Sequence, residues 1–274
     1  MTYYKVMLSI DTALFYLPIL AIGCVAGFMA GLLGIGGGLI IVPALTLLLS
    51  AQGYDNQTIM HIALGTSLAS IVFTSLSSIV AHHRHAAILW PTVVRMSAGI
   101  GAGTFAGALL ADHLSTDILV QIFGTYALVV AAQMGSRWRA GAHAQLPKIE
   151  GLTLAGVIIG AISSLLGIGG GSLSVPYLMW HSVTIRKAVA TAAANGLPIA
   201  VAGAVGYAIS GLDNLGWQGL QVGYVHLGAL AALITGSVLL APLGAKWAHR
   251  IDPARLEQFF ALLMALIGLK MLLF

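Results

Sequence analysis

Apolar stretches separated by short polar connections recur along the whole chain, and most are about as long as a helix needs to cross a bilayer. The pattern predicts ten such segments, at 13–33, 38–50, 59–81, 88–111, 116–135, 151–167, 172–181, 187–210, 220–246 and 253–273. Helices are expected rather than a membrane barrel. Barrel strands are short and alternate apolar with polar positions, whereas these stretches are long and apolar throughout. The sequence therefore predicts an all-α polytopic membrane protein.

A single polar linker divides the segments into two halves of five, and the halves match as repeats. The first repeat covers 1–135, the linker 136–150 and the second repeat 151–274. An offset of 133 superimposes Gly23, Gly27, Gly34, Gly36, Gly37, Gly38 and Pro43 on Gly156, Gly160, Gly167, Gly169, Gly170, Gly171 and Pro176. Offsets of 125 and 137 superimpose Thr66 on Thr191, and Gly99 and Gly107 on Gly236 and Gly244. Because five is odd, the repeats are expected to have inverted topology.

The basic residues test this topology through the positive-inside rule. If the linker is cytoplasmic, the cytoplasmic connections hold Arg84, Arg137, Arg139, Lys148, Arg186, Lys187, Lys246, Arg250 and Arg255. The outer connections hold no lysine or arginine, so both termini are predicted to face the periplasm. An alternative count treats 13–33 with 38–50, and 151–167 with 172–181, as single spans. It would put Lys148 and the connection with Arg186 and Lys187 on opposite sides of the membrane, so it is rejected. The distribution of basic residues fits two cases equally: these paired segments either cross the membrane fully or re-enter it and return to their own side.

Composition narrows the functional classes. Hydrophobic residues make up 59% of the chain and charged residues 7%, whereas soluble domains carry about a quarter. The net charge of +4 is therefore attributed to basic residues that set the membrane topology, and no nucleic-acid partner is expected. The sequence shows no nucleotide-binding motif, metal cluster or nucleophile–base pair, so an enzyme, a cofactor and a metal site are not expected. The lone Cys24 allows no internal disulfide. A homo-oligomer is compatible with the sequence.

The sequence GIGGG occurs at 34–38 and again at 167–171, each time with a proline five residues after the last glycine, at Pro43 and Pro176. Glycine and proline both disfavour a helix interior. We expect a helix broken at membrane depth, an extended stretch (LIIV or SLSV), and a short helix whose first turn holds the proline. Free amides at such a break favour an anion. The alternative is that the glycines only allow close helix packing.

On these duplicated motifs, nearly the whole chain resembles the sulfite exporter TauE/SafE family. The resemblance implies a bacterial inner-membrane permease for small sulfur-containing anions, such as sulfite or organosulfonates, that usually works outward. It does not define the substrate within that class. The competing hypothesis is a channel or permease for an inorganic ion, either thiosulfate, sulfate or a metal cation held by glycine carbonyls.

Candidate substrate-binding residues follow from the motifs and from matched polar positions in the next segments. The backbone candidates are Gly36, Gly37, Gly38, Gly169, Gly170 and Gly171, and the side-chain candidates are Thr66, Ser67, Ser70, Ser172, Thr191 and Asn195. Hydroxyl and amide groups can donate to a sulfonate oxygen. The alternative for these side chains is hydrogen bonding between helices. Arg95 either contacts the substrate or extends to the cytoplasmic interface.

Other polar residues are given structural interpretations. The sequence HHRH at 82–85 could gather anions, but a solvated cytoplasmic connection is favoured. His61 and His226 are expected near segment ends, at the interface rather than in catalysis. Trp90, Trp180, Trp217 and Trp247 are interpreted as interface anchors. The expected partners are thus a small anion and the lipid bilayer.

Overall fold

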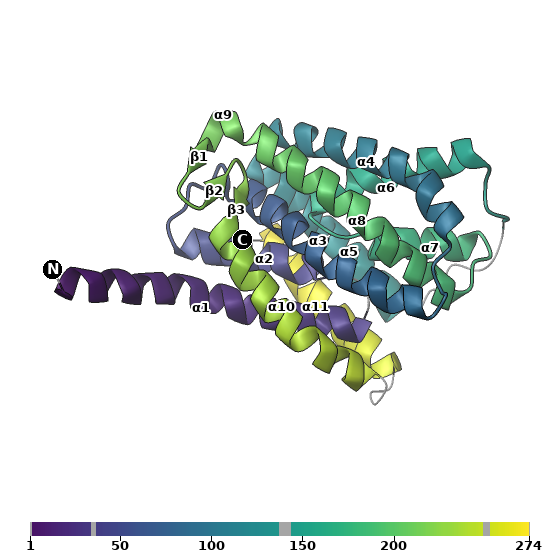
Figure 1. Cartoon of the computed structure of the whole chain (residues 1–274), viewed down its shortest axis with the longest axis horizontal. Helices are drawn as coiled ribbons and strands as arrows, with labels where there is room; N and C mark the ends of the chain where they lie inside the picture. The colour runs from purple at the N-terminus through teal and green to yellow at the C-terminus, as the bar shows by residue number, and fades with distance from the viewer. Residues whose placement is uncertain (1, 34–36, 137–143, 249–252, 274) are drawn as a thin grey trace.

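The computed structural model describes residues 2–33, 37–136, 144–248 and 253–273. Ten helices match the ten expected segments: α1 (Thr2–Leu33), α2 (Gly38–Ala51), α3 (Ile59–Arg84), α4 (Trp90–Asp112), α5 (Thr116–Gly135), α6 (Ile149–Leu166), α7 (Gly171–Trp180), α8 (Ile185–Ser210), α10 (Leu227–Ala248) and α11 (Pro253–Leu273). Between α8 and α10 the chain forms α9 (Leu212–Leu215) and the antiparallel strands β1 (Trp217–Gln218), β2 (Gln221–Val222) and β3 (Val225–His226) (Figure 1).

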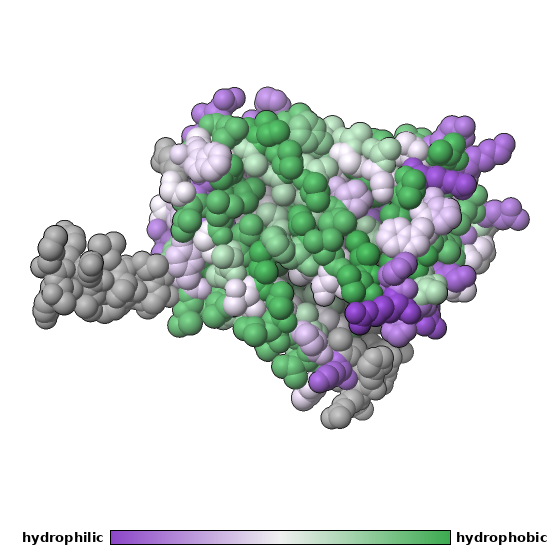
Figure 2. All heavy atoms as spheres, in the orientation of Figure 1, coloured by the Kyte–Doolittle hydropathy of each residue, from purple (hydrophilic) through white to green (hydrophobic). Residues whose placement is uncertain are grey.

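The helices form the bundle of a polytopic membrane protein. Among the described residues, seven helices are long and apolar enough to cross a bilayer: α1, α3, α4, α5, α6, α8 and α10. Large apolar side chains such as Leu17, Val94 and Leu239 lie exposed on the outside, where lipid would cover them. Figure 2 shows hydrophobic residues over most of one face, with hydrophilic residues gathered mainly at the right-hand end and along the margins.

Helices α3 and α8 form the centre of the bundle and pack against each other. The spanning window of α3 is 78% buried and that of α8 is 56% buried, which are the two largest buried shares among the seven. Around them, α1 packs on α10, α4 packs on α6, and α5 packs on α11. Each of these outer pairs joins a helix from before the linker to one from after it.

Glycines bring the outer pairs into close contact. A methyl group on Gly23 would lie 2.6 Å from the Leu233 carbonyl oxygen across the α1–α10 contact. A methyl group on the matched Gly156 would lie 2.6 Å from the Met96 carbonyl oxygen across the α4–α6 contact. Small residues at such crossings let backbones approach, which is how helices pack in lipid. Gly23 and Gly156, which lie outside the GIGGG motifs, thus serve close helix packing.

The two glycine-broken pairs each return toward the end from which they start. The Ala144 amide, just before α6, donates to the carbonyl of Trp180 at the end of α7 over 3.2 Å. The rings of Phe15 in α1 and Tyr54, just after α2, stack with centroids 6.3 Å apart. A fused single span is therefore excluded for both pairs. The labelled chain termini lie at the end that carries the strands (Figure 1).

Two local expectations were wrong. The stretches LIIV and SLSV are helical, and Pro43 and Pro176 stand inside α2 and α7, each at the sixth helical residue. Burial of Leu39, Ile41 and Val42 overrides the extended preference of β-branched residues. The segment expected from residue 220 begins as a helix only at Leu227, because 217–226 pair as strands and turns.

Candidate anion site at the start of α7

The backbones of the two glycine motifs meet inside the bundle. A methyl group on Gly38 would lie 2.5 Å from the Gly167 carbonyl oxygen and 2.9 Å from the Ile168 Cα. Both distances are shorter than a carbon atom tolerates, so only glycine fits at position 38. Gly36 lies outside the described residues. The break after α6 therefore packs directly on the start of α2.

Helix α6 ends at Gly167, whose φ of 61° and ψ of 30° are left-handed and favour glycine. The amides of Gly167 and Ile168 turn back to the carbonyls of Ser164 and Ser163. The freed Gly167 carbonyl accepts a 2.7 Å hydrogen bond from the fully buried Ser67 hydroxyl of α3. Ser67 therefore holds the break in place, and its hydroxyl proton is already used.

The first turn of α7 presents backbone amides without partners. Its first helical hydrogen bond runs from the Ser174 amide to the Gly170 carbonyl over 2.7 Å. No hydrogen bond found in the described part of the chain uses the amides of Gly171, Ser172 or Leu173. The first turn of a helix leaves such donors free and carries a partial positive charge. This geometry is suited to an anion.

Buried hydroxyls without partners stand beside these amides. Ser174 is fully buried, and its Oγ has no hydrogen-bond partner. That Oγ lies 3.2 Å from the point where a methyl group on Gly170 would sit. Ser172 Oγ is buried and unpartnered as well. A buried hydroxyl without a partner costs about 1–3 kcal/mol, so native proteins rarely keep one without a reason.

Helices α3 and α8 close the other side of the same space. A methyl group on Gly196 would lie 2.8 Å from Ser75 Oγ and 3.9 Å from the Gly170 amide nitrogen. Asn195, one residue earlier, is fully buried, and its Nδ2 reaches only the Met96 sulfur at 3.6 Å. The Asn195 Oδ1 has no partner. We call Gly170, Gly171, Ser172, Ser174 and Ser75 the α7 site, and Asn195 lies on α8 next to Gly196, with its side chain at Met96 of α4.

The electrostatics of the bundle interior come from dipoles rather than from full charges. Where the structure defines burial, the buried polar side chains are serine, threonine, asparagine and histidine, without any Asp, Glu, Lys or Arg. Nor does any group of three or more His, Cys, Asp or Glu side chains suited to a metal ion occur in that part of the chain. A small anion at the α7 site would thus meet amides and hydroxyls.

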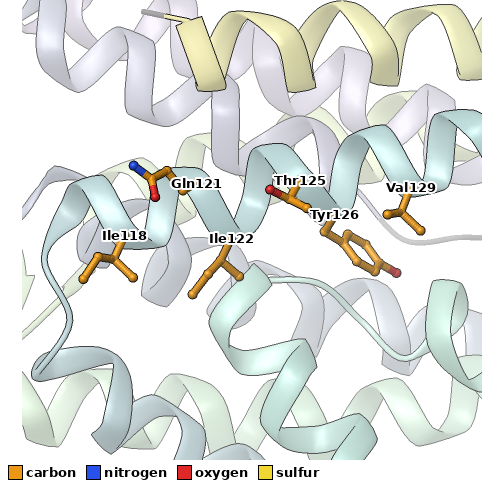
Figure 3. Close-up of a pocket in the computed structure, with 6 residues that line it drawn as sticks. All are labelled: Ile118, Gln121, Ile122, Thr125, Tyr126 and Val129. Carbon is orange, nitrogen blue, oxygen red and sulfur yellow. The ribbon is translucent and has the colours of Figure 1, made fainter.

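An open groove runs along the outer face of α5, close to the α7 site. Its volume is about 440 Å³, and Figure 3 shows its six lining residues, Ile118, Gln121, Ile122, Thr125, Tyr126 and Val129. Tyr126 approaches Ser172, although the two hydroxyls do not meet the geometry of a hydrogen bond. Tyr126 therefore lies between this groove and the start of α7.

The two matched threonines have structural hydrogen bonds. Thr66 Oγ1 accepts from the His226 amide over 3.1 Å, and Thr191 Oγ1 accepts from the Leu89 amide over 3.0 Å. His226 directly precedes α10, and Leu89 directly precedes α4. Thr191 follows Thr66 by 125 positions and His226 follows Leu89 by 137, so the two bonds are equivalent in the two halves. Each threonine fastens the start of a neighbouring helix to the central pair.

The remaining candidates lie apart from the α7 site. Ser70 Oγ donates to the Ser67 carbonyl in its own helix over 2.7 Å. Arg95 is exposed, in a stripe of α4 with Val94, Ala98 and Leu109 that faces the outside of the bundle. Gly37 lies against Ala26 and Ile41. Of the expected side chains, Ser67 contacts the second motif at Gly167 and Ser172 directly follows it, whereas the Asn195 amide reaches Met96 of α4.

Sequence reasoning did not select Ser75, Ser174 or Gly196. Ser174 carried one usable signal, since it stands two residues after Ser172 at the position matched by Ile41. Ser75 is one of seven hydroxyl residues between Thr66 and Ser78, and only the packing of α3 on α8 distinguishes it. Gly196 stands outside both glycine motifs.

A helical bundle with a broken helix pair and a buried polar site is the architecture of a membrane transporter. The family model described as "Sulfite exporter TauE/SafE" matches residues 19–271, and the chain belongs to that family.

Curated relatives agree with this class. A probable membrane transporter protein of Haemophilus influenzae is 32% identical over 261 residues, covering 94% of this chain and 98% of the relative. A protein of the same description from Methanocaldococcus jannaschii is 27% identical over 263 residues, covering 95% and 97%. The probable membrane transporter protein YunE of Bacillus subtilis is 26% identical over 278 residues, covering 94% and 97%. No solved structure matches the chain.

Proposed function

We propose that this protein is a secondary transporter of the bacterial inner membrane that exports small sulfur-containing anions, such as sulfite or organosulfonates. The α7 site binds the anion. One observation carries the proposal: free amides at the start of α7 and unpartnered buried hydroxyls lie together beside the contact between the two motifs. The family description, sulfite exporter, supports the substrate class.

The chemistry of the site fits such an anion. Sulfite and sulfonate groups each present three acceptor oxygens, and the site supplies donors in the amides of Gly171 and Ser172 and in the Ser172 and Ser174 hydroxyls. The partial positive charge of the helix start replaces a full cation. Because no buried lysine or arginine holds the anion, it can leave again, as transport requires.

We further propose two inverted repeats, 1–135 and 151–274, with the 136–150 linker in the cytoplasm and both termini in the periplasm. Three features support this arrangement. They are the equivalent bonds of Thr66 and Thr191, the equivalent α1–α10 and α4–α6 contacts, and the basic residues Arg84, Arg186 and Lys187 at the end opposite the strands.

The test is a thermal-shift panel on the purified protein with sulfite, sulfate, thiosulfate, taurine and divalent metals. We expect sulfite or a sulfonate to raise the melting temperature, and Ser174→Ala to remove that rise. The Ser97→Ala variant is the matched control, because this hydroxyl of α4 donates to Val93 in its own helix. Stabilisation by a divalent metal alone would favour the alternative, a channel or permease for a cation, and overturn the proposal.

A further inference from the structure

A plug formed by α9 and the three strands closes one end of the central helix pair. Tyr224, Val225 and His226 are buried, and the Tyr224 amide donates to the Tyr207 carbonyl of α8 over 3.1 Å. A methyl group on Gly65 of α3 would lie 2.7 Å from the Tyr224 carbonyl oxygen. The segment at 223–226 is therefore wedged between α3 and α8. The matched connection in the first half, 85–89, has no strand.

A polar cluster fastens this plug to the end of α4. The Tyr224 hydroxyl donates to Asp112 Oδ1 over 2.7 Å. Asn214 Nδ2, from α9, lies 3.2 Å from the same oxygen and 2.7 Å from the Tyr224 hydroxyl oxygen. Burial, and then the bond to Asp112, raise the pKa of Tyr224. Tyr224 thus remains a protonated donor across the physiological range.

His61 stands behind this cluster, and one of its two ring nitrogens has a hydrogen-bond partner. The side chain is 3% exposed, and its Nε2 lies 2.9 Å from the Ala111 carbonyl oxygen, so Nε2 carries the proton. The other nitrogen, Nδ1, is buried without a partner. The ring lies on the Tyr224 ring, with centroids 4.9 Å apart and planes inclined by 30°. A proton added to Nδ1 would have no acceptor while the plug is closed.

We propose that His61 is a proton-binding site whose protonation releases the plug and opens this end of the transporter. Histidine is the side chain that ordinarily changes charge between about pH 5 and pH 8. Protonation places a buried cation beneath Tyr224, and moving the plug exposes Nδ1 to water. Binding of the proton is thereby coupled to the open state, because only that state satisfies the second N–H.

Other titratable groups lie around this end of the bundle. They are Asp112 and His113 at the end of α4, Asp117 on α5, Tyr207 on α8, Asp213 on α9, Tyr224 and His226 on the plug, and Tyr54 and Asp55 before α3. His113, Asp117, Asp213 and Asp55 are exposed, so water satisfies either of their forms. Burial lowers the pKa of His226, whose Nδ1 already accepts from the Ala229 amide. Among the described histidines, His61 is thus the one with a buried ring nitrogen that lacks a partner.

The role in transport rests on the proposed function, but the opening itself is measured without any substrate. In a Cys24→Ser background, Val225→Cys places a thiol at a position that is 5% exposed, and Leu220→Cys places one that is 56% exposed on the same plug. The ratio of their maleimide labelling rates cancels the pH dependence of thiol ionisation. It therefore reports opening alone.

We expect this ratio to rise at least about fivefold from about pH 8 to about pH 5. His61→Gln should abolish the rise, because glutamine can still donate to Ala111 but does not titrate. His226→Gln should retain it. A flat ratio in the protein with His61, or an equal rise in His61→Gln, would overturn the proposal. If the labelling ratio rises as expected but the protein binds no sulfite, only the proposed substrate is refuted.

Discussion

The starts of α2 and α7 share the motif GIGGG and an internal proline but have opposite surroundings. At α2, the buried residues after the motif include Leu39 and Ile41, each 2% exposed. At α7, the matched residues are Ser172 and Ser174, both with buried unpartnered hydroxyls. The neighbouring Ser70 is satisfied within its own helix, whereas the matched Asn195 keeps an unpartnered oxygen.

This difference separates two roles of one motif. Both copies stand between two helices, but at α2 the residues that follow the motif are apolar and buried. At α7 the matched positions hold hydroxyls that lack partners. In the proposed two-repeat arrangement, the scaffold is symmetric and the divergence of side chains places the proposed binding groups on one side of it. The comparison predicts that substitutions at α2 change stability and that substitutions at α7 change affinity.

The largest effect is expected at Gly38, where the two motifs touch. Gly38→Ala puts a methyl group against the backbone of Gly167 and Ile168, which cannot move aside as a side chain would. We expect a loss of about 3 kcal/mol in the free energy of unfolding. Thermal unfolding in detergent measures it, with Gly101→Ala as control, because a methyl group there meets no atom within 4 Å. Equal stability of both variants would show that the motifs do not meet as described.

Ser174→Ala should change stability and affinity in opposite directions. Removing a buried hydroxyl without a partner should raise the free energy of unfolding of the anion-free protein by about 1 kcal/mol. Losing a donor to a charged ligand should weaken sulfite binding about tenfold to a hundredfold. Melting temperature and calorimetric affinity on the same preparation measure both quantities. A fall in both would identify Ser174 as a packing residue.

The smallest effect is expected at Arg95, which lies outside the comparison. Because its side chain is exposed on the outer stripe of α4, Arg95→Gln should change sulfite affinity by less than about twofold. It should also shift the free energy of unfolding by no more than about 0.5 kcal/mol. The same calorimetric titration measures the affinity. If Arg95→Gln folds but no longer binds sulfite, Arg95 belongs to the substrate site and this prediction is wrong.

The sequence was sufficient for the helices and for where the chain breaks. Hydrophobic length predicted each membrane segment, because a helix in lipid must be apolar along its whole span. The offset that matches Gly23 with Gly156 came from the sequence, and the structure gives both glycines a close helix crossing. Such features depend on local composition, which one sequence contains in full.

What the sequence could not predict depends on contacts between distant segments. Local preference suggested extended chain before Pro43 and Pro176, but both stretches are helical in the packed bundle. Thr66 and Thr191 looked like substrate ligands, yet each meets the amide that precedes a distant helix. Ser75 became a candidate only because Gly196 brings α8 against it. No pattern along the chain encodes these pairings.

The most direct test of the central claim is the sulfite affinity of Gly37→Ala and Gly170→Ala, measured side by side by calorimetry. A methyl group on Gly37 would lie 3.2 Å from Ala26 Cβ and 3.2 Å from Ile41 Cδ1, among apolar atoms. A methyl group on Gly170 would lie 3.1 Å from Ile199 Cδ1 and 3.2 Å from both the Ala192 carbonyl oxygen and Ser174 Oγ, within the α7 site. We predict roughly tenfold weaker binding for Gly170→Ala and unchanged affinity for Gly37→Ala. Equal losses in both variants, or intact affinity in Gly170→Ala, would contradict an anion held at α7 alone.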